Sequence, residues 1–182
     1  MTGARADIPA VIRASTEADR AALLALYPQD FPEEDLRPLV SALLDFKAGE
    51  GITSMVSTIQ QTPVAHILFT QARSSGSDED YALLGPLCVA PACQRRGIGR
   101  TLVTEGTALL AAQGCARVFV LGDPGYYRQF GFRREDSIVP PYPAPPAWAE
   151  AWQSLPLRED GAQAGGILSL PAPWHDPALW AP

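Results

Sequence analysis

The sequence predicts a mixed α/β domain in which helices flank a central β-sheet. Apolar residues follow strand-like spacing in several stretches and helical spacing in others, and the two kinds of stretch are interspersed along the chain. The consecutive segments 81–89, 98–113 and 115–121 have the patterns of strand, helix and strand. Strands joined through such a helix run parallel with a right-handed crossover, so these segments predict a parallel pair at the centre of the sheet.

Length and composition indicate a single globular domain that spans residues 1–182, with residues 1–8 as a loose N-terminus. The formal net charge is −6, from 14 basic and 20 acidic residues, which argues against binding to nucleic acid. No apolar run reaches the roughly 18 residues of a membrane helix, and the N-terminus lacks the apolar core of a signal peptide. We therefore expect a cytoplasmic protein with no membrane partner.

The three cysteines and two histidines do not have the spacing of a metal site, and no metal is expected. Cys88 and Cys115 lie in apolar surroundings, which predicts buried free thiols. Cys93 lies just before a glycine-containing turn, where a helix N-terminus would lower its pKa. We do not assign it a catalytic role.

The first elements are a short strand and two helices. An apolar run at 10–13 predicts the strand, and Ser15 and the residues after it provide the N-cap of a helix of about three turns. Pro28 and Pro32 are expected to interrupt this helix. Apolar residues at helical spacing predict a second helix over about 36–47.

Three strands are predicted next. Segments 51–59 and 64–70 form a hairpin, and the polar segment 74–80 is expected to be a mobile loop. Strand 81–89 follows, with Gly85-Pro86 in its middle. Because proline lacks the N–H that a sheet ladder needs, we expect a β-bulge at this dipeptide.

The C-terminal part starts after the buried strand 115–121 and a short helix at 124–130. Seven residues at 140–146 include five prolines, which predicts an extended segment on the surface. Two further apolar runs, at 148–157 and 166–170, predict a closing β-hairpin followed by an aromatic tail.

The segment 94–101, Gln-Arg-Arg-Gly-Ile-Gly-Arg-Thr, is the most informative stretch of the chain. It joins a predicted strand to a predicted helix through two glycines, an arrangement that aims several backbone N–H groups and the positive end of the helix dipole at one point. Adjacent arginines add charge that suits a diphosphate. A Walker A loop requires lysine where Arg100 stands, and a dinucleotide fingerprint requires a small residue where Leu102 stands.

This string, preceded by Val89-Ala90-Pro91, closely resembles the acetyl-CoA loop of the GNAT superfamily of N-acetyltransferases. A second stretch, 122–132, resembles the family's late motif, a short helix with a tyrosine that ends in Gly-Phe. The two matches cover roughly residues 81–134. The resemblance implies the GNAT fold, with an antiparallel N-terminal part, a parallel central pair, and strands that splay apart at the acetyl-CoA site.

The resemblance also implies a function: transfer of an acetyl group from acetyl-CoA to a primary amine, on a small molecule or a peptide, by direct attack in a ternary complex. It implies a possible homodimer through the C-terminal strands. The alternative is a module of the same fold that binds acetyl-CoA or CoA as a sensor, without turnover. The residues expected to bind the cofactor are Leu87, Cys88, Val89, Gln94, Arg95, Arg96, Gly97, Ile98, Gly99, Arg100, Thr101 and Tyr127.

By the same resemblance, the backbone N–H of Val89, with Leu87 as second choice, polarises the acetyl carbonyl. Tyr127 protonates the departing thiolate, and Tyr126 is the adjacent alternative. The base that deprotonates the amine is not evident from the sequence. Candidates are Glu33, Glu34, His66 or a chain of water molecules. We expect segments 28–38 and 73–80 and the proline-rich C-terminal part to shape the acceptor pocket.

Overall fold

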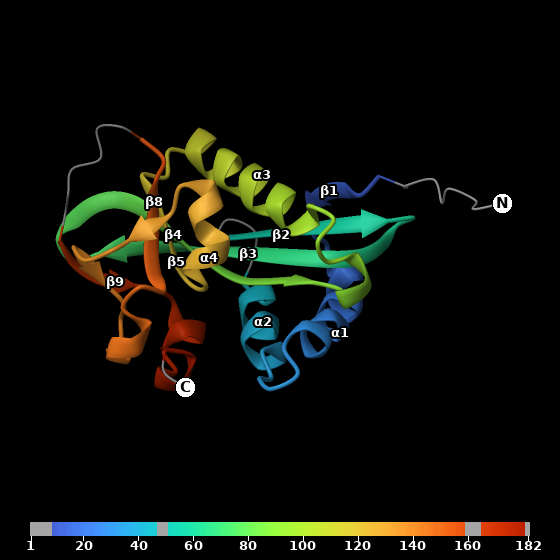
Figure 1. The fold of residues 1–182 in the computed structure, drawn as a ribbon, viewed down its shortest axis with the longest axis horizontal. Helices are drawn as coiled ribbons and strands as arrows, with labels where there is room; N and C mark the ends of the chain where they lie inside the picture. The colour runs from blue at the N-terminus through green and yellow to red at the C-terminus, as the bar shows by residue number, and fades with distance from the viewer. Residues whose placement is uncertain (1–8, 47–50, 159–164, 181–182) are drawn as a thin grey trace.

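The structure is a computed structural model that describes residues 9–46, 51–158 and 165–180. Its described residues form a nine-stranded mixed β-sheet with helices on both faces (Figure 1). The predicted mixed α/β fold is therefore confirmed. The predicted loose N-terminus, residues 1–8, lies outside the described residues.

The helices and strands follow one another in the order that the sequence predicts as far as residue 130. The helices are α1 (Arg20–Asp30), α2 (Arg37–Leu44), α3 (Ile98–Ala112) and α4 (Pro124–Tyr127). The strands are β1 (Val11–Ala14), β2 (Ile52–Ile59), β3 (Thr62–Ser74), β4 (Ser77–Val89), β5 (Arg117–Leu121), β6 (Arg133–Arg134), β7 (Ile138–Val139), β8 (Trp152–Pro156) and β9 (Gly166–Ser169).

The sheet is antiparallel at both ends and parallel in its middle. Its strand order is β1-β2-β3-β4-β5-β8-β6, and β9 pairs with the end of β3 and with β7. Strands β4 and β5 are parallel over Tyr81–Leu84 and Arg117–Val120, and α3 connects them. The strand–helix–strand unit therefore lies where the sequence places it.

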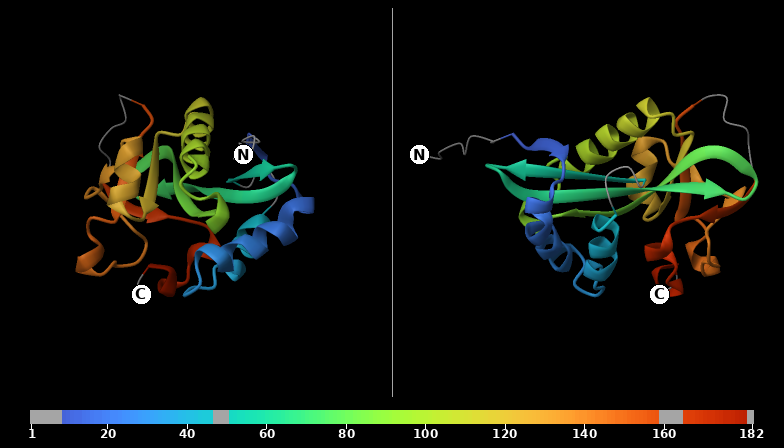
Figure 2. Two further views of the ribbon diagram at one scale, coloured as in Figure 1. Left: turned by 45° about the vertical axis from the view of Figure 1, so that its right-hand side comes forward. Right: turned by 180° about the vertical axis from the view of Figure 1, so that it is seen from behind.

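Two hydrophobic cores lie on opposite faces of the sheet. Because side chains alternate along a strand, Leu68 of β3 contributes to one core while Ile67 and Phe69 contribute to the other. Helices α1 and α2 cover the first face together with the C-terminal segment, in which Trp174 and Trp180 are buried (Figure 2). Helices α3 and α4 lie over the second face (Figure 1).

Strand β4 is irregular at Gly85-Pro86, as predicted. Its register with β3 pairs Leu84 with Phe69 and Leu87 with Ile67, so β4 has one residue more than β3 across this interval. On its other edge, the pairing of β4 with β5 ends at Leu84. The last residues of β4 therefore continue beyond the parallel pair with one edge not paired to β5.

Two local predictions are wrong. Helix α1 continues through Pro28 to Asp30, because a proline near the end of a helix removes one hydrogen bond without ending the last turn. The segment 74–80 is not a loop: β3 and β4 extend into it, with Ser74 paired to Ser77. Pairing in the long hairpin provides hydrogen bonds for the backbone groups of these polar residues, and an ion pair between Arg73 and Asp80 joins its two strands.

The predicted closing hairpin is also wrong, because β8 and β9 do not pair with each other. Strand β8 lies antiparallel to β5, where Trp152 stacks on Phe119 at a ring distance of 5.5 Å. Strand β9 pairs instead with Arg73 and Ser74 at the end of β3. Strand β8 pairs with the second edge of β5, and β9 pairs with the end of the long hairpin. No local pattern in the sequence indicates which sheet edges remain unpaired.

Candidate active site

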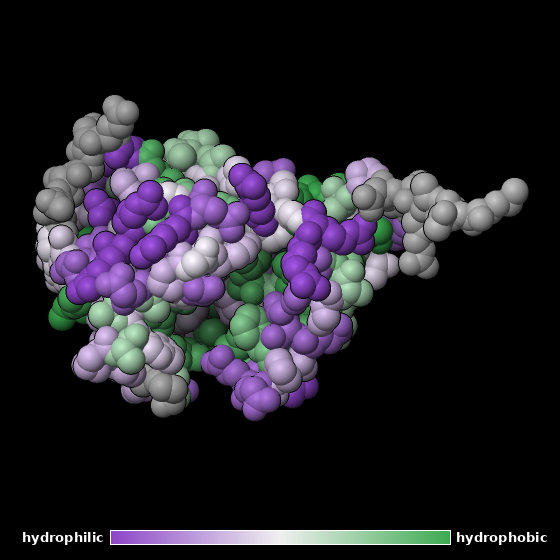
Figure 3. Space-filling model, in the orientation of Figure 1, coloured by the Kyte–Doolittle hydropathy of each residue, from purple (hydrophilic) through white to green (hydrophobic). Residues whose placement is uncertain are grey.

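A cavity of about 500 Å³ lies where β4, the N-terminus of α3, the end of α1 and α4 meet. In the view of Figure 3, hydrophobic residues line a hollow at the centre of the molecule, between α3 and α4 on one side and α1 and α2 on the other. The residues that line the cavity are Asp30, Leu87, Val89, Cys93, Gln94, Arg95, Gly97, Ile98, Gly99, Arg100, Asp123, Tyr126, Tyr127 and Gln129.

The N-terminus of α3 presents unpaired backbone N–H groups to this cavity. The helix begins after Gly97, which has a φ of +80°, and no side chain caps it. The first helical bond at this end runs from the Thr101 N–H to the Gly97 carbonyl at 2.9 Å, so the N–H groups of residues 98–100 have no partner within the helix. Together with the helix dipole they form a site for an anion.

Charge and small residues around the helix end suit a diphosphate. Arg95 and Arg100 line the cavity, whereas Arg96 is exposed and does not. A β-carbon on Gly99 would lie 2.9 Å from the Tyr126 hydroxyl oxygen and 3.3 Å from Val89, so only glycine leaves this space open. Thr101 is outside the cavity lining, and its hydroxyl bonds the Gly97 carbonyl at 3.0 Å.

Both tyrosines of the late motif reach the cavity. Tyr127 is buried with its ring against Gly122, and Tyr126 is half-buried with its ring 5.0 Å from that of Tyr127. Burial raises the pKa of both phenols above their ordinary value, so both keep their protons at neutral pH. Within the described part of the chain, neither hydroxyl has a hydrogen-bond partner.

The end of β4 is tied to the end of α1 by an acidic side chain. The Val89 N–H donates to Oδ2 of Asp30 at 3.1 Å. The Gln94 side-chain amide donates to Oδ1 of Asp30 at 2.6 Å and to the Val89 carbonyl at 3.1 Å. Because the next N–H, that of Ala90, bonds Val64 on β3, the Val89 N–H faces away from β3 and towards the cavity.

Asp30 is one of the cavity residues that sequence reasoning missed, with Cys93, Asp123 and Gln129. The proline at position 28 suggested that the helix ended there, which placed Asp30 in an unassigned connection. In the structure Asp30 is the last residue of α1 and lines the cavity, whereas Glu33 and Glu34 are exposed in the following loop and do not line it. The helical period from Leu23, Leu26 and Tyr27 would have placed Asp30 on the same face, and this was the available signal.

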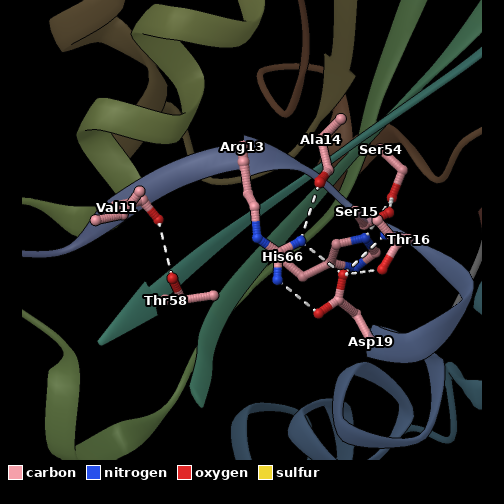
Figure 4. A network of polar contacts seen from close by, with 9 residues as sticks. All are labelled: Val11, Arg13, Ala14, Ser15, Thr16, Asp19, Ser54, Thr58 and His66. Carbon is pink, nitrogen blue, oxygen red and sulfur yellow. Dashed lines mark hydrogen bonds and ion pairs between the residues drawn. The ribbon is translucent and has the colours of Figure 1, made fainter. Parts of the chain in front are cut away.

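His66 lies in the interior and not in the cavity. Its side chain is fully buried, with Nδ1 2.7 Å from the Tyr27 hydroxyl and Nε2 2.8 Å from the Ser54 hydroxyl. Burial lowers its pKa to about 4. Figure 4 shows the histidine beside Ser54, whose hydroxyl also pairs with that of Ser15, and shows Asp19 bonded to Arg13 and Thr16 just before α1. The bond from Tyr27 to His66 joins α1 to β3.

Cys88 also faces the interior. Its thiol is fully buried on the α1 side of the sheet, and burial raises its pKa to about 12. Its neighbours Leu87 and Val89 point their side chains to the cavity on the other face. Only the backbone of Cys88 therefore lies along the free edge of β4.

Two segments that we expected at the acceptor pocket do not line this cavity. The hairpin end at 73–80 and the proline-rich segment 140–146 contribute no lining residue to the cavity among the residues that the structure describes. The proline-rich segment lines a groove of its own, of about 540 Å³, together with Trp148 and Ile167. Only the 28–38 segment contributes, through Asp30.

A family comparison matches this architecture. The model of the acetyltransferase (GNAT) family matches residues 20–132, well over half of the chain. The chain belongs to the GNAT acetyltransferase family. The predicted family and enzyme class are therefore confirmed, and the matched residues span α1 to the end of the late motif.

Relatives in sequence and in structure agree with this assignment. YjhQ of Escherichia coli K12, named as an uncharacterized N-acetyltransferase, is 34% identical over 146 residues, which cover 78% of this chain and 81% of YjhQ. The crystal structure of the E. coli GNAT N-acetyltransferase YhbS in complex with CoA has a TM-score of 0.82, with 26% identity and 93% of both chains covered.

A third relative was solved with the acetylated cofactor. The GNAT acetyltransferase of Brucella melitensis in complex with acetyl-CoA has a TM-score of 0.73 and 27% identity, and 91% of this chain and 98% of that chain are covered. Among the described residues, no helix is long and apolar enough to cross a membrane. Nor do those residues contain three or more His, Cys, Asp or Glu side chains grouped to hold a metal ion.

Proposed function

We propose that this GNAT acetyltransferase moves the acetyl group of acetyl-CoA to a primary amine by direct attack in a ternary complex. The observation that carries the proposal is the meeting, in one cavity, of an uncapped helix N-terminus, a strand edge not paired to β5, and two tyrosine hydroxyls that have no partner among the described residues. In this proposal, the helix N-terminus binds the diphosphate, the strand edge polarises the acetyl carbonyl, and a tyrosine hydroxyl stabilises the thiolate.

The donor binds along α3 and β4 in this proposal. The N–H groups of residues 98–100 and the side chains of Arg95 and Arg100 hold the diphosphate. The pantetheine arm lies along residues 87–89, whose edge is not paired to β5. A backbone N–H of that edge, from Leu87 or Val89, polarises the acetyl carbonyl, a type of donor that typically contributes about 3 kcal/mol in the transition state.

Tyr127 stabilises the departing thiolate. Its hydroxyl has no partner among the described residues, and its raised pKa keeps it protonated in the free protein. The same raised pKa makes complete proton transfer to sulfur less favourable than it is for an exposed phenol. Hydrogen-bond donation to the developing negative charge on sulfur is therefore the main role that we assign to this residue.

The sensor alternative predicts binding without turnover. It depended on the lack of an evident base, and the carboxylate of Asp30 in the cavity weakens that argument. Two measurements distinguish the enzyme from the sensor. Calorimetry measures acetyl-CoA binding, and a thiol reagent measures CoA release with a panel of amines that includes spermidine, kanamycin, tryptamine and an unblocked peptide.

Catalysis requires CoA release that depends on both protein and amine, together with mass spectrometric detection of the acetylated amine. Tight binding of acetyl-CoA with no release above background for any amine supports the sensor. Failure to bind acetyl-CoA refutes both readings.

A further inference from the structure

Asp30 occupies a position that general electrostatics disfavours. It is the last residue of α1, at the negative end of the helix dipole, where a carboxylate typically destabilises a helix by a few tenths of a kcal/mol or more. Two hydrogen bonds offset this, one from the Val89 N–H and one from the Gln94 amide. Both donors come from elements about sixty positions further along the chain, so the contact exists only in the folded cavity.

One of these donors is a backbone group that the proposed reaction needs. The Val89 N–H faces the cavity from the unpaired edge of β4, where a donor for the acetyl carbonyl oxygen is required. In the free protein the Asp30 carboxylate holds it. A carboxylate and the developing oxyanion of a tetrahedral intermediate cannot share one N–H without strong repulsion, so the two oxygens must exclude one another.

We propose that Asp30 is the residue that receives the acceptor amine, and that acetyl-CoA releases it for this role by taking over the Val89 N–H. The inference rests on the proposed function. In the free protein, Asp30 covers the acyl-oxygen position. With the thioester bound, the released carboxylate remains at the end of α1 beside the cavity, where a cationic amine approaching the carbonyl carbon meets it.

The step balances as an acyl transfer. The amine nitrogen forms a bond to the carbonyl carbon, and the electrons of the C=O bond move to oxygen. When they return, the C–S bond breaks, and its electron pair leaves with sulfur. The nitrogen of a cationic primary amine loses two protons in all. The Asp30 carboxylate takes the first before the attack and passes it to solvent, and the second leaves the nitrogen after the attack and reaches the thiolate, held by Tyr127, through solvent. The products are the amide and CoA.

The displacement is tested by comparing two ligands on two variants. Asp30→Ala uncovers the Val89 N–H, so acetyl-CoA should gain affinity over CoA, which has no acyl oxygen. We expect the ratio of the CoA dissociation constant to that of acetyl-CoA to rise at least threefold in calorimetry. Using a ratio cancels the general effect of removing a negative charge near an anionic ligand. Glu105→Ala, on the exposed face of α3, is the matched control and should leave the ratio unchanged.

The acceptor role is tested with two minimal nucleophiles, propylamine and hydroxylamine. Propylamine is cationic near neutral pH and must lose a proton before it attacks, whereas hydroxylamine is already uncharged. Asp30→Asn keeps an oxygen that accepts from the Val89 N–H but removes the charge. After subtraction of the rate without protein, we expect kcat/KM for propylamine to fall at least 100-fold in Asp30→Asn and kcat/KM for hydroxylamine to fall less than fivefold.

Each arm has an outcome that overturns the inference. An unchanged ligand ratio in Asp30→Ala means that Asp30 does not compete with the acetyl oxygen. Equal losses for both nucleophiles in Asp30→Asn mean that Asp30 only holds β4 and Gln94 in place. If the parent protein binds acetyl-CoA but releases no CoA with any amine, the proposed function fails instead, and the ligand ratio still decides whether Asp30 is displaced.

Discussion

Replacing Gly97 tests whether the N-terminus of α3 is the diphosphate site. The residue lines the cavity, and a β-carbon built on it meets no atom within 4 Å, so a side chain fits without collision. Its φ of +80° lies in the left-handed region, which asparagine and aspartate tolerate better than other residues. Gly97→Asp and Gly97→Asn therefore form a matched pair that differs by one negative charge.

The expected effect follows from electrostatics. Both variants adopt a left-handed conformation at a cost of about 1 kcal/mol, so their melting temperatures should be similar. A carboxylate about 5 Å from a phosphate repels it by about 1–3 kcal/mol for effective dielectric constants between about 80 and 20. Gly97→Asp should therefore bind acetyl-CoA about fivefold to 150-fold more weakly than Gly97→Asn, because about 1.4 kcal/mol corresponds to a factor of ten.

Calorimetry with acetyl-CoA at low and high salt measures this difference. In about 1 M salt the Debye length falls to about 3 Å, so the affinities of the two variants should converge. Equal affinities at low salt in folded variants would refute the argument, because a diphosphate at this helix end must respond to the charge.

Three other predictions concern the tyrosine, the buried histidine and the C-terminal strands. Tyr127→Phe should lower kcat by about 10²–10³-fold with little change in the dissociation constant of acetyl-CoA, and a larger effect of Tyr126→Phe would transfer the role to the neighbouring ring. The pKa of His66 is about 4 in the folded protein against an ordinary 6.5, so its contribution is fully present above pH 6.5 and is lost as the pH falls to about 4. Denaturant unfolding should show a loss of about 3 kcal/mol over this interval that His66→Gln lacks, and equal slopes would contradict the assignment. Glu135→Ala should lower the free energy of unfolding by about 3 kcal/mol, because it leaves the half-buried Arg117 without the carboxylate that pairs with it at 2.7 Å, and a loss under about 1 kcal/mol would show that solvent replaces the pair.

The helix N-terminus and the irregular strand at the cavity were predictable because local sequence encodes them. Two glycines at a strand-to-helix turn fix where the N–H groups of α3 point, and the proline at position 86 signals the irregular ladder of β4. Each of these features depends on conformational limits of one or two residues. The position of Tyr127, four residues before Gly131, is likewise set by a single helical turn.

The position of Asp30 in the cavity was not predictable because it depends on long-range placement. Asp30 meets Val89 only after α1 docks on the sheet, and no local pattern reports that contact. A histidine ordinarily titrates in the range of a catalytic base, yet the strand position of His66 turns its side chain into the core beside Tyr27, where burial lowers its pKa to about 4. The pairing of β8 with β5 depends in the same way on which sheet edges remain free.

Two halves of the cavity are built from different kinds of atom. Backbone N–H groups and glycines form the first half, so nearly any side chain introduced there collides with a neighbour or adopts a strained conformation. Asp30 lines the second half, and the loop 32–35 that follows it has exposed side chains and lies outside the cavity lining. Mutations in that loop should change the free energy of unfolding little and should not weaken the binding of acetyl-CoA. Under the proposed function, a combinatorial library restricted to 32–35 should change the preference among amines while the binding of acetyl-CoA stays unchanged.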